Sequence, residues 1–416
     1  MTIREAAFLT DLPEPAERNM AVRVAPAGER ALRRRHPWLF ERAIRDQSYP
    51  GKPGDLAVAF DAKERFLAAG LYDPRSPIRI KVLQHGAPAR IDEGWFRARL
   101  AAAAERRAPL TNTDTTGYRL VHGENDGVPG LVVDRYSGTL VLKMYTSAWI
   151  SHLRRLLPAL EEVQPFERLV LRLGRTLEAY PEDLYGLSDG QVLWGPETDG
   201  PVPFLENALH FEANVIRGQK TGFFFDQRDN RARVERLAHA RSVLNVFSYT
   251  GGFSIYAARG GASSLLSVDV SIPALEAAER HFSLNRDHPC VASAQHSTLA
   301  GDAFAVLENL ASDGRRFDLV VIDPPSFAQS QAQVPGALAA YGRLTTLGLG
   351  VLAPEGTLVM SSCSSRVSAD AFYERVLDAA AGAGRTLREI ARTGHPLDHP
   401  IGFPEGAYLK CLFATG

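Results

Sequence analysis

The sequence predicts an α/β protein whose C-terminal part is a parallel, doubly wound sheet. From about residue 205, short apolar runs alternate with helical segments, a rhythm typical of parallel sheets covered on both faces. Before that point, strand-like runs separated by Gly and Pro favour a small β-barrel, and a mixed stretch favours a small α+β domain. We therefore expect a loose tail at 1–20 and domains at 21–90, 91–203 and 204–416.

The first segments are interpreted from their turn residues and charges. Residues 1–20 mix charge with proline, which predicts the loose tail. From Ala21 to about Leu83 the runs AVRVAP, GDLAVAFD, RFLAAGLYD and IRIKVL predict the strands of the barrel. One helical stretch, Gly28 to Phe40, interrupts them and carries several arginines.

The middle segment contains both kinds of element. Residues 91–108 predict an amphipathic helix, which Pro109 ends. The elements expected after it are strands and turns over Gly117–Tyr145, a helix at Ser151–Leu160 and a strand at Arg168–Leu173. The Gly- and Pro-rich segment from Gly195 to Pro203 marks a domain boundary.

The C-terminal part supplies the regular alternation. The expected strands are Ser242–Phe247, Ser264–Asp269, Phe317–Ile322 and Gly356–Ser361. The expected helices are Phe253–Arg259, Ile272–Asn285 and Ala337–Leu352. Ligands of such sheets bind at the carboxyl ends of the strands, so residues that directly follow the strands are the candidates for a site.

Composition limits the classes of function. The chain has 416 residues, 45% hydrophobic and 23% charged, with a net charge of -1, so any RNA-binding surface must be local. Cys290, Cys363 and Cys411 are far apart and lack CxxC spacing, which argues against a disulfide framework or a metal site. The N-terminus lacks an apolar signal region and no run approaches 18 apolar residues, so we expect a soluble, cytoplasmic protein without a membrane partner.

A glycine-rich turn, LNVFSYTGGFS, follows the first strand of the alternating region. Gly251 and Gly252 allow the backbone to approach a ligand closely. The turn lacks GxGxxG and suits a nucleoside without a phosphate. Asp269, at the end of the next strand, is suited to accept both ribose hydroxyls, and Asp302 to accept from an adenine amine. Each residue alone is better explained as a turn or cap residue. The ordered set favours S-adenosylmethionine as cofactor.

The run FDLVVIDPPSF predicts a buried strand that ends in a stiff acidic loop. Asp323 falls where active-site residues collect, and Pro324 and Pro325 remove backbone donors and stiffen the chain. Phe327 is placed to stack on a flipped base. The alternative is a rigid turn with a capping Asp.

Cys363, in SSCSSR, follows another predicted strand and should reach the same edge of the sheet. Carbon 5 of cytosine is a poor nucleophile, and addition of a thiolate at carbon 6 makes it enamine-like and able to accept a methyl group. Asp323 is the candidate acid near ring N3. The alternative is a cysteine packed as a small hydrophobe, which is how we interpret Cys290 and Cys411.

With these motifs the chain resembles the class I S-adenosylmethionine-dependent methyltransferases of the ribosomal RNA large-subunit methyltransferase I type. The resemblance covers GERALRRRHPWLFERAI, YRLVHGENDGVPGLVVDRY, GQKTGFFFDQRDNR, DPPSF, SSCSS and DHPIGFPEGAYLKCLF. It implies a PUA-like RNA-binding domain at 21–90, a Rossmann-like catalytic domain at 204–416, and 5-methylcytosine formation in large-subunit ribosomal RNA. A homodimer is also compatible with it.

The resemblance also implies roles for individual residues. Cys363 matches the nucleophile and Asp323 the acid, although Ser361 stands where the family motif often has a first cysteine. The residues that match cofactor contacts or adjoin them are Lys220, Thr221, Gly222, Asp226, Asn245, Phe247, Tyr249, Gly251, Asp269, Ser271, Asp302 and Ala303. The residues expected to contact RNA are Pro324, Pro325, Phe327, Arg33, Arg34 and Arg35.

Some alternatives stay open. Without the resemblance, the arginines are better explained as a solvated helix face than as a patch that contacts phosphates. Asp398, His399 and Glu405 either line a cleft or cap turns. A guanine or exocyclic-amine methyltransferase would attack directly in the DPPSF loop and would not need the thiol. A non-catalytic RNA-binding protein would bind RNA without turnover, which the cofactor set and Cys363 disfavour.

Overall fold

The computed structural model describes residues 2–416, which divide into two compact units. The N-terminal unit comprises residues 2–208, 213–225 and 397–403, and the C-terminal unit comprises residues 209–212, 226–396 and 404–416. Two segments from the C-terminal end of the chain therefore belong to different units.

The first part of the N-terminal unit is a six-stranded sheet in the order β2-β6-β5-β4-β1-β3. Its strands are β1 (Met20–Val24), β2 (Trp38–Phe40), β3 (Ile44–Gln47), β4 (Leu56–Phe60), β5 (Phe66–Tyr72) and β6 (Ile78–His85). The helix of this sheet, α1 (Pro26–Arg33), is shorter than the helical stretch expected from Gly28 to Phe40. Pro37 explains the difference, because it restricts the residue before it and cannot continue a helix, and Trp38 to Phe40 pair with β6 instead.

The first residues of the chain differ from the expectation of a loose tail. The 3-10 helices Ile3–Glu5 and Ala7–Asp11 bury Ile3, Leu9 and Leu12 in the core of the unit. Arg154 fastens them by donating to the carbonyl oxygens of Leu9, Thr10 and Leu12. The charged residues and prolines of this segment predict a loose tail, but Ile3, Leu9 and Leu12 are apolar and pack into the core.

The second part of the N-terminal unit is a five-stranded sheet in the order β11-β10-β9-β8-β7. Its elements are α2 (Glu93–Arg107), β7 (Gly117–His122), β8 (Leu131–Tyr136), β9 (Thr139–Met144), α3 (Leu153–Val163), β10 (Arg168–Leu173) and β11 (Val192–Trp194), followed by β12 (Val202–Glu206). α2 and α3 contact each other, and the buried rings of Phe96 and Trp149 lie 6.0 Å apart. The expected helix at 91–108 and the strand at 168–173 are confirmed.

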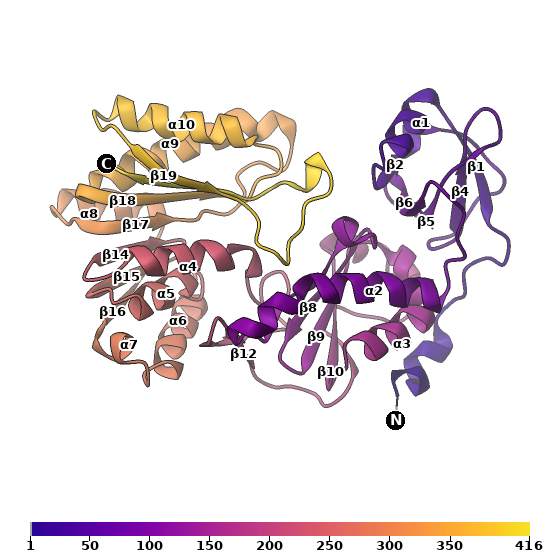
Figure 1. The fold of residues 1–416 in the computed structure, drawn as a ribbon, viewed down its shortest axis with the longest axis horizontal. Helices are drawn as coiled ribbons and strands as arrows, with labels where there is room; N and C mark the ends of the chain where they lie inside the picture. Colours follow the sequence, from indigo (N-terminus) through magenta and orange to yellow (C-terminus); the bar gives the residue numbers. More distant parts are fainter. Residues whose placement is uncertain (1) are drawn as a thin grey trace. The chain divides into compact units, whose positions relative to one another are not determined.

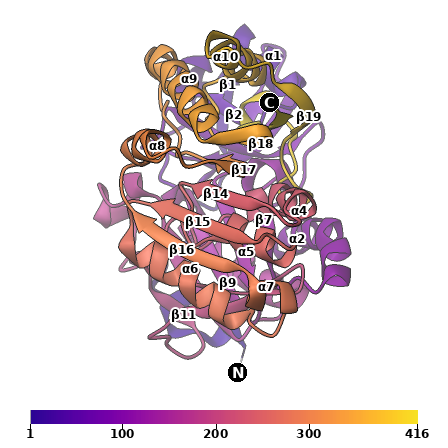
Figure 2. The same ribbon diagram turned by 90° about the vertical axis from the view of Figure 1, so that its left-hand side faces the viewer.

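The C-terminal unit is built on a seven-stranded sheet in the order β16-β15-β14-β17-β18-β20-β19 (Figure 2). Its strands are β14 (Ser242–Val246), β15 (Ser264–Asp269), β16 (Gln295–Ala300), β17 (Phe317–Ile322), β18 (Leu352–Ser362), β19 (Arg388–Thr393) and β20 (Lys410–Thr415), while β13 (Leu209–Ala213) precedes them. β16, β15, β14, β17 and β18 are parallel, and β20 is antiparallel to both its neighbours. The predicted doubly wound α/β class is confirmed.

Helices cover both faces of this sheet. They are α4 (Arg228–Leu237), α5 (Gly252–Arg259), α6 (Ile272–Leu284), α7 (Pro289–Ser293), α8 (Ala303–Ser312), α9 (Val334–Gly350) and α10 (Ala369–Gly382). α4, α5 and α6 pack together in one layer, and α8, α9 and α10 in the other; α9 and α10 lie beside β18 and β19 in Figure 1. Local signals start these helices, since Ser271 and Ser368 cap α6 and α10 through their hydroxyls.

Candidate active site

Five of the predicted residues lie at one edge of the C-terminal sheet. Asn245 lies near the end of β14 and Asp269 is the last residue of β15, while Asp302 follows β16. Asp323 follows β17 directly, and Cys363 follows β18 directly. Because these strands are parallel neighbours, their carboxyl ends meet at the same edge, where doubly wound sheets bind ligands.

The loop after β14 has an unusual backbone. Phe247 and Tyr249 adopt left-handed conformations (φ 60° and 47°), which cost non-glycine residues on the order of 1 kcal/mol each, and Gly251 does so without that cost. Asp269 compensates, because its Oδ2 accepts a hydrogen bond from the Tyr249 amide at 2.8 Å. Its Oδ1 accepts from the Ser271 amide at 2.9 Å. Asp269 thus joins the ends of β14 and β15 into one rigid cradle.

Helix packing also limits the space at the two glycines. A Cβ on Gly251 would lie 2.7 Å from the Cβ of Ala278, and one on Gly252 would lie 3.1 Å from Cδ of Arg231. The sequence suggested glycine for close approach of a ligand; the structure shows that α6 and α4 already occupy the space of a side chain. At position 251 both reasons favour glycine.

The chemistry of this loop fits a nucleoside cofactor. Within residues 2–416, three buried polar atoms in and before it have no hydrogen-bond partner: Asn245 Oδ1, Ser248 Oγ and Thr250 Oγ1. Such atoms are normally satisfied, so a polar ligand or water is expected to complete them. Asn245 is itself fixed, since its Nδ2 donates to Ser254 Oγ at 2.9 Å. Hydroxyl and amide groups of this kind match a ribose and an amino acid better than a phosphate.

Asp302 has the capping role that was the alternative for it. Its Oδ1 accepts from the amides of Phe304 and Ala305, both at 3.1 Å, and so begins α8. The side chain is exposed, and no partner is recorded for its Oδ2 among residues 2–416. Ala303 is the buried first residue of the helix. The cap therefore leaves one carboxylate oxygen for a ligand amine.

A chain of hydrogen bonds orients Asp323. Gln227 donates from Nε2 to Asp323 Oδ1 at 2.8 Å. Asn230 donates from Nδ2 to Gln227 Oε1 at 2.6 Å, and Thr393 Oγ1 donates to Asn230 Oδ1 at 2.5 Å. Gln227 and Asn230 are buried. A buried amide that donates to one oxygen fixes the plane of the carboxyl group.

Cys363 lies beside the loop that contains Asp323. Its Sγ is 3.8 Å from the carbonyl oxygen of Pro324, and Ser364 Oγ donates to the carbonyl oxygen of Ala328 at 3.1 Å. The two loops that follow β17 and β18 are thus held together. The half-buried ring of Phe327 lies 5.3 Å from that of Tyr341, so it packs on α9 with one part of its surface.

The other two cysteines differ from Cys363. Cys411 lies inside β20 and is fully buried, and burial raises the pKa of its thiol to about 12. A thiol with so high a pKa is a poor nucleophile. Cys290 lies in the short helix α7, away from the carboxyl edge of the sheet.

Three of the predicted cofactor contacts belong to the N-terminal unit. Thr221 is buried there and donates from Oγ1 to Asp134 Oδ2 at 2.5 Å. Lys220 has a left-handed backbone (φ 54°), as does Gly222 (φ 129°). Asp226 belongs to the C-terminal unit, where its Oδ2 accepts from the Tyr408 hydroxyl at 2.9 Å. The TGFFFDQRDNR motif therefore spans the point where the chain passes from one unit to the other.

The predicted arginine patch is divided in the structure. Arg33 is engaged in ion pairs with Glu29 at 2.7 Å and Asp61 at 2.9 Å.

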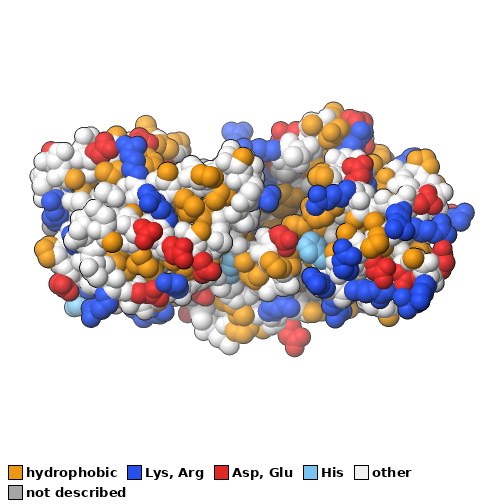
Figure 3. Space-filling model, turned by 90° about the horizontal axis from the view of Figure 1, so that it is seen from above, with side chains coloured by type: hydrophobic (Ala, Val, Ile, Leu, Met, Phe, Trp, Pro, Cys, Tyr) orange, Lys and Arg blue, Asp and Glu red, His pale blue; other side chains and the backbone are white. Residues whose placement is uncertain are grey.

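The next two arginines are differently placed. Arg34 is exposed, and Arg35 lines a pocket of about 190 Å³ together with Arg99, Gln84 and Phe403. Figure 3 shows many Lys and Arg side chains over the N-terminal sheet, interrupted by acidic ones. Arg34 and Arg35 are better placed than Arg33 to meet a phosphate.

The alternatives left open near the C-terminus are partly answered. Asp398 and His399 are buried in the N-terminal unit, where Asp398 Oδ2 accepts from the Arg119 amide at 3.0 Å and His399 Nδ1 lies 3.1 Å from Asp398 Oδ1. Both anchor the segment 397–403. Glu405 is exposed in the C-terminal unit.

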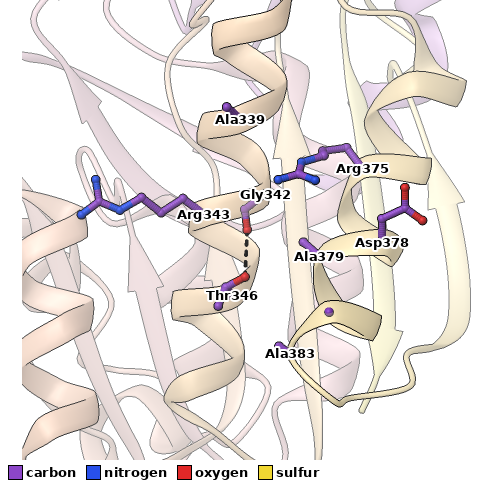
Figure 4. Close-up of a pocket in the computed structure, with 9 residues that line it drawn as sticks. Ala339, Gly342, Arg343, Thr346, Arg375, Asp378, Ala379 and Ala383 are labelled. Carbon is purple, nitrogen blue, oxygen red and sulfur yellow. Dashed lines mark hydrogen bonds between the residues drawn. The ribbon is translucent and has the colours of Figure 1, made fainter.

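A groove of about 420 Å³ lies between α9 and α10, away from these loops. Figure 4 shows Gly342 and Thr346 on the side of α9 and Ala379 and Ala383 on the side of α10, with Arg375 directed toward α9. It contains neither a nucleophile nor a cradle for a nucleoside. The candidate site is therefore the carboxyl edge of the sheet.

Several residues of the site are not predicted from the sequence. Gln227 and Asn230 lie in the second half of the TGFFFDQRDNR motif, and Lys410 lies in YLKCLF beside Cys411. A lysine inside an apolar strand is the sequence signal that could have indicated Lys410, because lysines are rarely buried.

Within residues 2–416 there is no cluster of three or more His, Cys, Asp and Glu suited to a metal. No helix there has the length and apolarity to cross a membrane.

Comparison with known proteins agrees with this fold. Residues 119–414 match the model of an S-adenosylmethionine-dependent methyltransferase family, and residues 22–85 match a PUA-like domain. The chain therefore belongs to the S-adenosylmethionine-dependent methyltransferases, with a PUA-like domain at its N-terminal side.

Similar proteins narrow this class. The ribosomal RNA large subunit methyltransferase of Deinococcus radiodurans is 49% identical over 406 residues, covering 96% of this chain and 98% of that protein. The ribosomal RNA large subunit methyltransferase I of Pseudoalteromonas translucida is 38% identical, covering 94% and 98%. Within the class, the chain is a member of this ribosomal RNA large subunit methyltransferase family.

A solved structure confirms the fold. A methyltransferase complexed with SAH has 22% sequence identity and a TM-score of 0.80, covering 95% of this chain and 100% of that one. An S-adenosylmethionine-dependent methyltransferase from Streptococcus mutans gives a TM-score of 0.79 at 22% identity. At this identity the likeness concerns the arrangement of the chain alone.

Proposed function

We propose that this protein transfers a methyl group from S-adenosylmethionine to carbon 5 of a cytosine in large-subunit ribosomal RNA, through a covalent adduct with Cys363. The observation that carries the proposal is the placement of Cys363 Sγ 3.8 Å from the carbonyl oxygen of Pro324, next to Asp323. A thiol and an oriented carboxyl group at one strand edge are the two groups that this chemistry requires.

The cradle after β14 is suited to hold the cofactor. Asp269 and the loop from Phe247 to Gly251 would hold the ribose, and Asp302 Oδ2 is the candidate acceptor for the adenine amine. S-adenosylmethionine supplies an electrophilic methyl group when it is bound. The protein must present carbon 5 of the base to that methyl group and exclude water from the reaction.

The protein's own groups perform the remaining steps. The Cys363 thiolate adds to carbon 6, and the electrons of the 5,6 double bond make carbon 5 nucleophilic while Asp323 gives a proton to N3. After carbon 5 has gained the methyl group, its proton leaves to a base. The sulfur–carbon bond then breaks, which restores the ring and the thiolate, and N3 returns its proton to Asp323. The Gln227 amide keeps Asp323 oriented through both transfers.

The second candidate is direct attack by a guanine or exocyclic amine held in the DPPSF loop. It shares the cofactor cradle and Asp323 but gives the thiol no task. The position of Cys363 against the Pro324 carbonyl supports the covalent route instead.

Trapping of the adduct tests the proposal. RNA containing 5-fluorocytosine cannot lose a carbon-5 proton, so the enzyme should remain attached to it after methyl transfer. With cofactor present, we expect a denaturation-resistant complex whose cross-linked peptide contains Cys363. Wild-type enzyme that methylates natural RNA but forms no such complex would contradict the covalent mechanism.

A further inference from the structure

A buried lysine lies next to the proposed nucleophile. Lys410 is the first residue of β20 and pairs with Ser362 at the end of β18, so the antiparallel register places it one residue from Cys363. Its side chain is only 4% exposed. The ε-amino group donates a hydrogen bond to the carbonyl oxygen of Ser364, the residue that follows Cys363.

Lys410 lacks the partner that buried lysines usually have. Within residues 2–416 the structure records no carboxylate in an ion pair with it, and the Ser364 carbonyl oxygen is its one recorded hydrogen-bond acceptor. A buried ammonium without a counter-charge is unfavourable by several kcal/mol. Burial accordingly lowers the pKa of Lys410 to about 8, and the charge of the Cys363 thiolate opposes that effect. Cys363 is thus the acidic group that opposes the effect of burial on Lys410.

Several groups near the thiol are acidic or stay neutral. Asp323, after β17, is itself acidic. Tyr341 on α9 and Cys411 on β20 are buried, and burial raises the pKa of each to about 12, so both stay neutral near pH 8. Arg233 on α4 lies over the ring of Phe413, 5.5 Å from its centre, and acts on Cys411.

We propose that Lys410 activates Cys363 by holding a positive charge beside its sulfur, which stabilises the thiolate needed for attack on the base. The proton of the thiol passes to a solvent base, and the ammonium remains as counter-charge. This inference rests on the proposed function only for the identity of Cys363 as nucleophile. Lys410 is a positioning residue for that nucleophile, since it acts on the sulfur and not on the substrate.

Glutamine separates the charge of Lys410 from its structural role. In Lys410→Gln the side chain retains a donor for the Ser364 carbonyl oxygen but loses the charge, and Lys410→Arg keeps both. The measurement is the rate at which iodoacetamide alkylates Cys363 in the full-length protein between about pH 6 and 10, followed by mass spectrometry of its peptide. The Cys290 peptide in the same sample serves as the reference.

The expected result is a loss of thiol reactivity. A nearby opposite charge shifts a pKa by about 1–3 units, so Lys410→Gln should alkylate Cys363 at least about tenfold more slowly near pH 7 and recover at higher pH. Lys410→Arg should keep the wild-type profile. The kcat of methyl transfer in Lys410→Gln should fall and recover in the same way. An unchanged alkylation profile in Lys410→Gln would overturn the inference.

Failure of this inference is distinguishable from failure of the proposed function. Alkylation reports the thiol without any RNA or cofactor, so a slower reaction in Lys410→Gln supports the inference even if Cys363→Ala retains methyl transfer. Conversely, an unaltered profile together with an inactive Cys363→Ala would leave Cys363 as nucleophile and remove Lys410 as its activator.

Discussion

Two buried lysines, one in each unit, show opposite ways of accommodating a charge. Lys81 on β6 donates to Asp73 Oδ2 at 2.8 Å and to the carbonyl oxygen of Ile78 at 3.1 Å, and Thr146 donates to the same Asp73 oxygen at 2.7 Å. Among residues 2–416, the one acceptor recorded for Lys410 on β20 is the Ser364 carbonyl oxygen. Burial lowers the pKa of both, but only for Lys81 does a carboxylate oppose it.

The difference between Lys81 and Lys410 distinguishes a buried charge that stabilises the fold from one proposed to take part in the reaction. Other buried charges of the N-terminal unit are also paired, as Arg107 is with Asp126 at 2.7 Å and Arg119 with Asp134 at 2.8 Å. Such pairs fix geometry and leave no charge over. At the strand edge of the C-terminal unit, Lys410 instead donates to the carbonyl oxygen of the residue that follows Cys363. A buried ionisable group without a counter-charge is therefore a better indicator of function than a buried ion pair.

The largest loss of kcat is expected from an aspartate at β17. Asp318 lies near the start of this strand and Asp323 directly follows its end. Asp323→Asn should lower kcat by about 10²–10⁴-fold, because it removes the proton donor for N3. Asp318→Asn is the matched control: Asp318 accepts from the amide and hydroxyl of Ser242, at 2.9 and 2.7 Å, so the change should cost about 1 kcal/mol of stability and spare kcat. Single-turnover methyl transfer and urea unfolding measure the two. Equal losses of kcat would contradict the assignment.

Removing the charge of each lysine should change the free energy of unfolding differently, with the larger loss at Lys81. Lys81→Met leaves Asp73 as a buried charge without its cation and should cost about 3–5 kcal/mol of unfolding free energy. Lys410→Met removes a charge that has no carboxylate partner among the described residues, and should be neutral or stabilising. Urea unfolding of both variants at one pH checks this. A cost for Lys410→Met as large as that for Lys81→Met would remove the distinction.

Acid should weaken the scaffold through His152. This buried ring lies 2.7 Å, through Nε2, from the Gly54 carbonyl oxygen, and burial lowers its pKa to about 4. The unfolded chain binds the proton near pH 6.5 and the folded one only near pH 4, so stability is full above that range and falls by roughly 3 kcal/mol as the pH drops through it. Urea unfolding at pH 7 and at pH 4.5 measures the loss, and His152→Gln should reduce the pH dependence. Equal pH dependence in the variant would assign the effect to other groups.

The smallest effect is expected from the residue that orients Asp323. Gln227→Ala removes one hydrogen bond to the carboxyl group, and we expect about a tenfold loss of kcat with little change in KM. Gln331→Ala, an exposed glutamine in the segment after the DPPSF loop, is the matched control and should leave both constants unchanged. A change confined to KM would indicate that Gln227 contacts substrate instead.

Local patterns predicted the elements better than the contacts between them. β15 and β17 were located to the residue, because apolar runs with sharp ends leave little choice. The order of the site residues along the chain placed Asp269, Asp323 and Cys363 at one edge, since parallel strands require it. Lys410 was not found, because only the pairing of β18 with β20, far apart in the sequence, places it beside the thiol.

The most direct test of the account follows a labelled methyl group from S-adenosylmethionine into unmodified large-subunit ribosomal RNA, with wild type, Cys363→Ala and Cys411→Ala. The account predicts label in 5-methylcytosine with wild type and Cys411→Ala, and at least about a 10³-fold loss with Cys363→Ala. Label in a guanine or adenine derivative that persists in Cys363→Ala would contradict it and assign the reaction to direct attack in the DPPSF loop.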